Sequence, residues 1–295
     1  MDINFELYKV FYFVSKTLSF SDASEKLYIS QSAVSQSIKT LEEKIGCQLF
    51  FRNTKRVKLT REGEMLFKHV EQAFNFLKSG ERTLEEMHSL EQGDIKIGAS
   101  DTICKYYLLP YLKSFNRLYP KIKIHITNRT SPKCIELLKN GSVDLSVINI
   151  PENLNVGNVH VTRTKSIHDI FVAGSGYAEL SDRKVALKEL ENYPILVLHK
   201  NTTTRGFFDT LLDNNGVTVN PEVELSSISL LVDMAVIGLG IAYVPDESVQ
   251  EELRSGKLFK LDIVEEVPER YLGIITHSNI PVSIAASKFI ELLEQ

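Results

Sequence analysis

Near the start of the chain, two helical patterns follow each other with only a few residues between them. Ser19 or Ser21 is placed to cap a helix that runs to Leu27, and the next helix begins at Ser30. Apolar residues at helical spacing predict one more helix before these two. Two helices joined this closely, the second opening with Ser and Gln, form the helix-turn-helix pattern.

The helix that begins at Ser30 has one apolar face and one face of small polar residues. Steps of four, three and four residues place these apolar side chains on one buried face: Val34, Ile38, Leu41 and Ile45. The opposite side and its flank carry Gln31, Ser32, Ser35, Gln36, Lys39 and Glu43. In a helix that enters the major groove, such amides and hydroxyls can hydrogen-bond to base edges, and glutamine suits adenine. The alternative is a solvated face with Ser30 as a simple N-cap.

The next segment, "FFRNTKRVKLTR", alternates apolar and basic residues and contains no acidic residue. Its basic residues are Arg52, Lys55, Arg56, Lys58 and Arg61. The alternation predicts a short hairpin or wing, and the charge matches a phosphate backbone. Because the chain has a formal net charge of -4, any contact with nucleic acid depends on such a local patch. A solvated charge run is the alternative.

A longer helical pattern follows, with a small or apolar residue at alternating steps of four and three. The series is Leu66, Val70, Ala73, Leu77, Gly80, Leu84 and Met87. A heptad pattern sustained over about three repeats predicts a helix that pairs with the same helix of another chain. A core helix of one domain would also bury such a stripe, but the many Lys and Glu residues around it favour the dimer helix.

From Gly93 onward, short strand-like runs alternate with helical stretches. Strands are expected at 95–99, 122–127, 143–150, 168–174, 193–199, 222–226, 240–245 and 270–277. Alternation at this spacing predicts βαβ units and a mostly parallel sheet.

Several classes of protein are disfavoured by what the sequence lacks. The N-terminus mixes charged with apolar residues, and no run of about 18 apolar residues occurs, so we expect a cytoplasmic protein without a membrane span. The three cysteines, Cys47, Cys104 and Cys134, are widely spaced, which favours reduced thiols. Metal-ligand spacing, a nucleophile motif and a complete dinucleotide fingerprint are all missing, so we expect neither a metal site nor an enzyme.

The chain resembles the LysR-type transcriptional regulators along almost its whole length. In the N-terminal region the match rests on "QSAVSQSIKTLE", "LFFR" and "LTREG". Further segments resemble the periplasmic-binding-protein-like sensor of that family: "YLLPYLKSFNRLYP", "LLKNGSVDLSVIN" and "VIGLGIAYVP". The resemblance implies an α+β multidomain protein with an N-terminal winged helix-turn-helix, a long linker helix and a C-terminal α/β sensor of two subdomains.

The resemblance also implies domain boundaries and partners. The winged helix-turn-helix would span 1–60, the linker or dimerisation helix 61–91 and the effector-binding domain 92–295. Within the last, subdomain I would combine about 92–163 with 268–295, and subdomain II would take 164–267. Members of the family usually form homotetramers, as dimers of dimers, which bind inverted-repeat promoter DNA and affect the access of RNA polymerase.

The DNA contacts of the family map onto two places in this sequence. On the Ser30 helix the resemblance implies base or phosphate contacts at Gln31, Ser32, Ser35, Gln36 and Lys39. In the wing it implies contacts at Arg52, Asn53, Lys55 and Arg56. Many relatives have Pro where Ser32 stands. Because the side chain stays small, we expect altered detail and no loss of function.

The effector cleft of the family maps onto loops between strands and helices. The implied residues are Ser100, Asp101, Thr102, Thr130, Asn149, Thr202, Thr203 and Arg205. Helix N-termini attract anions, so we expect an unidentified small anionic metabolite as effector, and no cofactor. Asp101 would repel an anion, so we expect it to point outward as a helix cap. For the threonines, turn and capping chemistry is the alternative.

A thiol redox sensor that uses Cys104 and Cys134 is the alternative function. No basic cluster flanks either cysteine strongly enough to predict a low thiol pKa. We therefore expect buried, inert thiols and a sensor that binds a metabolite.

Overall fold

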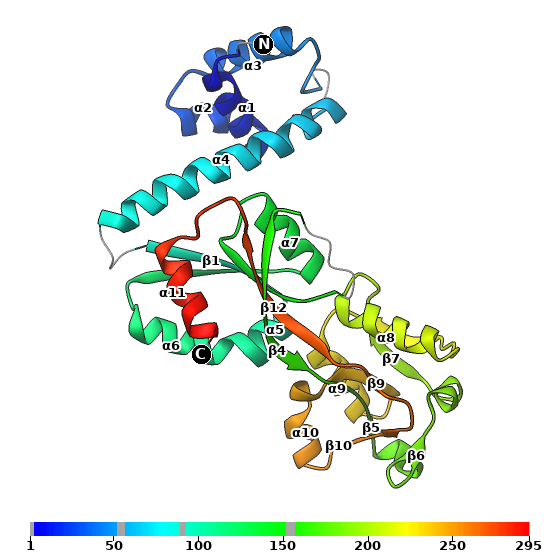
Figure 1. The fold of residues 1–295 in the computed structure, drawn as a ribbon. Coiled ribbons are helices and arrows are strands. Elements are labelled where there is room, and N and C mark those ends of the chain that lie inside the picture. Colours follow the sequence, from blue (N-terminus) through cyan, green and yellow to red (C-terminus); the bar gives the residue numbers. More distant parts are fainter. Residues whose placement is uncertain (1–2, 52–56, 89–92, 152–156, 295) are drawn as a thin grey trace. The chain divides into compact units, whose positions relative to one another are not determined.

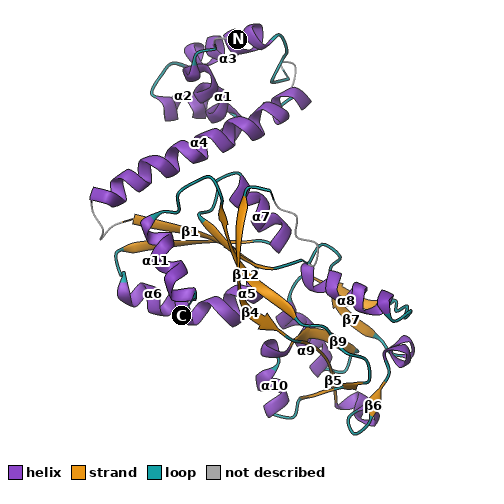
Figure 2. Cartoon of the chain, viewed as in Figure 1, coloured by secondary structure: helices purple, strands orange, loops and turns teal. Residues whose placement is uncertain are grey.

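The computed structural model describes residues 3–51, 57–88, 93–151 and 157–294, drawn in Figure 1. The chain divides into two compact units, Met1–Glu81 and Arg82–Gln295. The first unit is helical apart from a short hairpin. The second unit contains two five-stranded sheets, one small two-stranded sheet and the helices that pack on them (Figure 2).

The first unit is built from α1 (Phe5–Thr17), α2 (Phe20–Leu27), α3 (Gln31–Ile45) and the first part of α4 (Arg61–His88). The hydroxyl of Ser19 caps α2 by accepting a hydrogen bond from the amide of Asp22. The hydroxyl of Ser30 caps α3 in the same way, with the amide of Ala33 as donor. On α3 the predicted apolar face is buried at Val34, Ile38 and Leu41 and half-buried at Ile45. The predicted helix-turn-helix is therefore confirmed, with Ser19 as the cap.

A hairpin follows α3 and is tied to it by a buried carboxylate. Phe50 and Leu59 form an antiparallel bridge across the hairpin. The carboxylate of Glu42, near the end of α3, accepts the amides of Leu49 at 2.8 Å and Phe50 at 3.3 Å. A buried carboxylate requires such donors, so Glu42 fixes the base of the hairpin relative to α3.

Helix α4 has apolar side chains in two different surroundings. Phe74 is buried, and its ring stacks on that of Tyr12 with the centroids 4.7 Å apart. Further along the helix, Leu77 and Leu84 are exposed, while the side chain of Met87 lies outside the described residues. Leu66 and Val70, the first two residues of the heptad series, also pack in the core of the first unit, whereas Leu77 and Leu84 leave apolar side chains uncovered.

The first large sheet of the second unit has the strand order β2-β1-β3-β12-β4. Its strands are β1 (Gly93–Ala99), β2 (Ile122–Asn128), β3 (Leu145–Asn149), β4 (Val159–Ile167) and β12 (Arg270–His277). Its helices are α5 (Asp101–Ile103), the π-helical turn η1 (Cys104–Leu108), α6 (Leu109–Leu118), α7 (Ser131–Lys139) and α11 (Ile284–Leu293). Phe115 of α6 meets Phe289 of α11 edge-on at 5.2 Å, which closes the core of this subdomain.

The second large sheet has the strand order β10-β5-β9-β7-β8. Its strands are β5 (Asp169–Gly174), β7 (Ile195–Leu198), β8 (Pro221–Leu225), β9 (Ile241–Pro245) and β10 (Leu258–Lys260), and β6 (Lys184–Val185) pairs with β11 (Asp262–Ile263). Its helices are η2 (Ser175–Leu180), η3 (Leu187–Asn192), α8 (Thr203–Asn214), α9 (Ile228–Val236), η4 (Asp246–Ser248) and α10 (Gln250–Arg254). The rings of Phe171, Phe208 and Tyr243 meet in its core.

Strands occur at all the predicted places, but the expectation of a mostly parallel sheet is wrong. In the first sheet β1 is parallel to β2 and β3, whereas β12 is antiparallel to β3 and β4. In the second, β7 is parallel to β8 and β9, whereas β5 is antiparallel to β9 and β10. The crossover rule applies to strands that follow each other within one sheet, whereas the chain leaves the first sheet after β4 and returns to it only with β12. No crossover helix therefore sets the direction in which β12 pairs with β4. Strand β4 stays in the first sheet as far as Ile167, beyond the expected boundary at 163.

Candidate DNA-binding surface and effector cleft

The exposed side of α3 carries the polar residues expected to contact DNA. Gln31, Ser32, Ser35, Gln36 and Lys39 are all exposed. At the start of the helix, the Oγ atoms of Ser30 and Ser32 lie 2.9 Å apart. Lys39 Nζ lies 3.8 Å from a carboxylate oxygen of Glu43, an exposed ion pair of the kind that contributes little to stability. Lys39 can therefore exchange this partner for an anion outside the chain.

The expected wing contacts Arg52, Asn53, Lys55 and Arg56 lie outside the described residues. The two flanking basic residues that the structure does describe, Lys58 and Arg61, are exposed. The surface of the first unit therefore keeps positive charge close to the hairpin.

The second unit has a cavity of about 380 Å³ at the start of α8. It is lined by Pro132, Pro151, Lys200, Asn201, Thr202, Thr203, Gly206, Phe207 and Thr210. Pro132 lies in α7 and Pro151 follows β3, so both belong to the subdomain of the first sheet. The other lining residues lie in α8 or just before it, so the cavity is formed between the two subdomains.

The polar groups of this cavity favour a negatively charged ligand. Thr202 caps α8 by accepting the amide of Arg205, and its hydroxyl donates to the carbonyl of His199 at 2.9 Å. The first turn of a helix presents free amides and the positive end of its dipole. Among the described residues that line the cavity, Lys200 is the one with a charged side chain, and that charge is positive. The volume suits a small metabolite.

A second, smaller cavity of about 30 Å³ lies between η1 and the strands that join the sheets. Its polar lining residues are Thr102, Tyr106, Tyr107, Asn149, Lys165, Glu247 and Arg270. Lys165 of β4 pairs with Glu247 of η4 across the subdomain boundary, with Nζ and Oε1 3.0 Å apart. The other carboxylate oxygen of Glu247, Oε2, is buried and has no hydrogen-bond partner among the described residues. The space holds little more than a water molecule.

Four of the expected effector residues line neither of these two cavities: Ser100, Asp101, Thr130 and Arg205. Ser100 caps α5 by accepting the amide of Ile103. Asp101 accepts a hydrogen bond from Asn128 at 3.4 Å. Thr130 precedes α7 but makes no capping hydrogen bond through its side chain.

The guanidinium group of Arg205 is engaged inside its own subdomain. It is buried, and it contacts Asp209 at 2.7 Å, Glu224 at 3.1 Å and the carbonyl of Leu198 at 3.0 Å. The hydrogen bond from Arg205 lowers the pKa of Glu224. Arg205 therefore organises the start of α8, and its charge is already matched within the chain.

The two subdomains share a buried ion pair where β12 and β5 begin. The guanidinium of Arg270 donates two hydrogen bonds to the carboxylate of Asp169, one of them 2.8 Å long, and a third to the side chain of Asn149. Asp169 and Arg270 are 1% and 2% exposed. Asn149, expected to contact the effector, is thus a partner of Arg270 at the edge of the smaller cavity.

The thiols expected to be inert are protonated at neutral pH. Burial raises the pKa of Cys104 to about 11, and the nearby carboxylate of Asp101 adds to the rise. Burial likewise raises the pKa of Cys134 to about 11. Because the thiolate is the reactive form, both groups are poor nucleophiles at pH 7.

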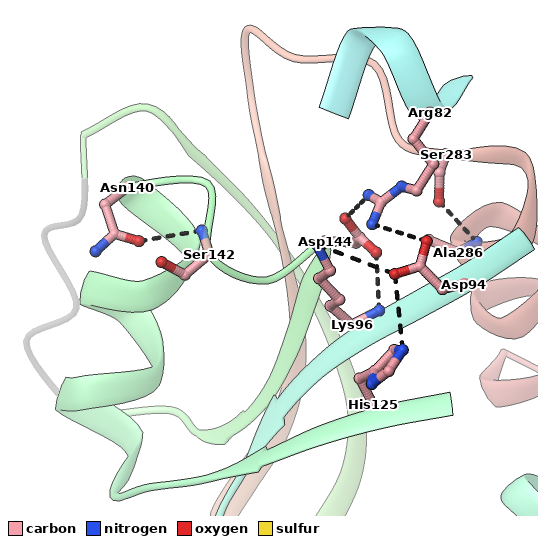
Figure 3. Close-up of polar contacts among 9 residues, drawn as sticks. All are labelled: Arg82, Asp94, Lys96, His125, Asn140, Ser142, Asp144, Ser283 and Ala286. Carbon is pink, nitrogen blue, oxygen red and sulfur yellow. Dashed lines mark hydrogen bonds and ion pairs between the residues drawn. The ribbon is translucent and has the colours of Figure 1, made fainter. Parts of the chain in front are cut away.

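A cluster of charges holds Arg82, near the end of α4, to the first sheet (Figure 3). The guanidinium of Arg82 forms an ion pair with Asp144, just before β3, and lies 3.5 Å from Asp94 of β1. Asp144 also accepts the amide of Lys96 at 2.8 Å, and His125 Nε2 lies 3.8 Å from Asp94. Arg82 and Asp144 are largely buried, so each charge depends on the other.

Sequence patterns gave no role to Lys165, Glu247, Arg270 or Arg82. Each pairs with a residue far away in the chain, and hydrophobic periodicity does not identify such partners. One signal was present: Arg270 and Asp169 are charged residues at the start of otherwise apolar strands. Among the residues that the structure describes, no helix combines the length and apolar character needed to cross a membrane. In the same residues, no group of His, Cys, Asp or Glu side chains is arranged to hold a metal ion.

Replacing Arg82 by Met should destabilise the second unit by about 2 to 4 kcal/mol, because Asp144 loses the partner of a largely buried charge. Urea unfolding followed by circular dichroism measures this change. Arg117→Met is the matched control, because Arg117 is exposed on α6 and its loss should change stability by no more than about 0.5 kcal/mol. Equal stability of the two variants would contradict a structural role for the cluster.

Comparisons with known proteins agree with these two units. The family "Bacterial regulatory helix-turn-helix protein, lysR family" matches residues 5–64, and "LysR substrate binding domain" matches residues 88–295. A probable RuBisCO transcriptional regulator of Cyanidioschyzon merolae is 30% identical over 92% of this chain and 91% of that protein. The transcriptional activator CmpR of Synechocystis is 25% identical over 97% of this chain and 93% of that protein.

Solved structures share the fold. Full-length CbnR complexed with its target DNA has a TM-score of 0.68 at 15% identity, covering 99% of both chains. A full-length OxyR variant from Pseudomonas aeruginosa has a TM-score of 0.71 at 19% identity, covering 100% of this chain and 94% of that one. The helix-turn-helix, the long helix and the two mixed sheets of the sensor are thus found together in this chain. It belongs to the LysR family of transcriptional regulators, which are DNA-binding proteins and not enzymes.

Proposed function

We propose that this regulator binds a small anionic metabolite between its sensor subdomains and that the ligand changes its binding to promoter DNA. The observation that carries the proposal is the cavity of about 380 Å³, which combines the start of α8, the hydroxyls of Thr203 and Thr210 and the ammonium group of Lys200. Thr202 and Thr203 are the expected effector residues that line it. A dipole, hydroxyl donors and one ammonium group together favour a carboxylate or a similar anion.

The position of Asp101 is compatible with an anionic effector. Its carboxylate accepts a hydrogen bond from Asn128, and it lines neither cavity. This carboxylate therefore does not repel an anion bound in the cavity at the start of α8. Thr102 and Asn149 line the smaller cavity, whose volume is too small for a metabolite in this conformation.

Promoter recognition is proposed for the exposed face of α3. Amide and hydroxyl groups at the N-terminal end of a recognition helix reach base edges in the major groove. The exposed Leu77 and Leu84 on α4 support pairing of that helix with its copy in a second chain. Such a dimer reads two half-sites of an inverted repeat, and two dimers form the proposed homotetramer that acts on RNA polymerase.

Thiol redox sensing is the weaker candidate. Burial leaves both Cys104 and Cys134 protonated near neutral pH, with pKa values of about 11. Redox sensors instead hold an exposed thiol whose pKa is low. The metabolite-binding function therefore has the better physical support.

Gln36→Ala should weaken binding to promoter DNA by about 1 to 3 kcal/mol and leave binding to a scrambled duplex unchanged, as expected for a contact to a base. Fluorescence anisotropy with both duplexes at the same salt concentration measures the two affinities. Gln48→Ala is a suitable control, because Gln48 is also exposed in the first unit but lies beyond α3. An equal loss on both duplexes would remove Gln36 from sequence reading.

Lys200→Gln should weaken the binding of an anionic effector about 10- to 100-fold, because it removes one charge-assisted hydrogen bond. The melting temperature of the full chain, measured against a panel of small carboxylates and their neutral amides, reports this binding. Lys257→Gln, an exposed lysine of the same subdomain, should behave as the native protein. Stabilisation by the amides as strong as by the acids would contradict the anionic assignment.

A further inference from the structure

Tyr28 lies in the turn between α2 and α3 and is 95% exposed. Among the described residues, none forms a hydrogen bond with its hydroxyl group or a ring contact with its side chain. An aromatic residue usually stabilises a fold by burying its ring. Tyr28 makes no such contribution to the first unit.

The backbone of Tyr28 favours a different residue at this position. It has φ 56° and ψ 38°, in the left-handed region. The amide of Ile29 donates to the carbonyl of Ser24 at 3.1 Å, and the amide of Tyr28 donates to that of Glu25 at 3.3 Å. Helices that end in this way favour Gly or Asn, because a bulky side chain is strained in the left-handed region. Neither packing nor backbone geometry therefore explains a tyrosine here.

We propose that Tyr28 is a DNA contact, with its hydroxyl donating to a backbone phosphate and its ring packing on the adjoining deoxyribose. The residue lies just before Ser30, which caps α3, and the inference rests on the promoter recognition proposed for that helix. When the first residues of such a helix reach base edges, the turn before it lies beside the strand that borders the groove. Tyrosine hydroxyls are among the groups with which proteins bind phosphates.

The charge near Tyr28 matches this partner. Lys26, in the last turn of α2, is exposed close to the turn. A lysine attracts the phosphate backbone over a distance, and the neutral phenol then adds a short-range hydrogen bond. Because the phenol carries no charge, its contribution adds no counterion release. Because phosphates are the same in every sequence, its contribution is independent of the base sequence.

The test uses the full chain and a promoter duplex that the native protein binds. Tyr28→Asn should raise the melting temperature of the first unit, since Asn suits the left-handed region, and should weaken DNA binding about 5- to 10-fold. Tyr28→Phe keeps the ring and should give a smaller loss. For both variants, the slope of log Kd against log salt concentration should equal that of the native protein.

Leu18→Asn is the matched control. Leu18 ends α1 with φ 50° and is half-exposed, so this variant changes the same kind of backbone position. It should keep native affinity for DNA. The proposal is overturned if Tyr28→Asn binds as the native protein does, if Leu18→Asn loses as much affinity, or if the melting temperature of Tyr28→Asn falls together with its affinity. A loss that depends on one base pair of the duplex would overturn the phosphate assignment.

Discussion

The buried ion pair between Asp169 and Arg270 is the contact on which the sensor depends. It joins the first residue of β5 in one sheet to the first residue of β12 in the other, and Asn149 of β3 takes the remaining hydrogen bond. Two charges removed from water are stable only when they are matched in this way, and removing one partner typically costs about 3 to 5 kcal/mol. The junction of the two subdomains therefore depends on the presence of both partners of a geometrically specific contact.

The subdomains are also bridged by a much weaker contact, between Lys165 and Glu247. These side chains are 43% and 29% exposed, and an ion pair so accessible to water contributes about 1 kcal/mol or less. The smaller cavity beside this pair contains the unpartnered Glu247 oxygen, which gains from access to water. The proposed response to a ligand would need the exposed bridge to separate while the buried pair at the junction stays intact. A ligand that binds one arrangement better than the other then shifts the balance between them.

Local features of the sequence were enough to predict the helices of the first unit and the strands of the second. Caps such as Ser30, the spacing of Val34 and Ile38, and alternating apolar runs each depend on neighbouring residues. The mixed sheets were not predictable, because pairing direction depends on how the chain passes between sheets. The pairs that hold the cleft were missed for the same reason, since Asp169 and Arg270 are 101 positions apart. Thr202 and Thr203, which the family resemblance assigned to the effector cleft, lie beside the larger cavity, and their contact with an effector stays a prediction.

The most direct test of this account is a binding titration of the purified protein with the DNA upstream of its own gene. A scrambled duplex of equal length serves as reference, and each titration is run with and without a pool of small metabolites divided into anionic, neutral and cationic fractions. The account predicts preference for the native duplex, altered by the anionic fraction and unaffected by the others. Two results would contradict the account. In the first, only the cationic fraction alters the preference for the native duplex. In the second, no fraction alters this preference, but treatment of the protein with mild peroxide does.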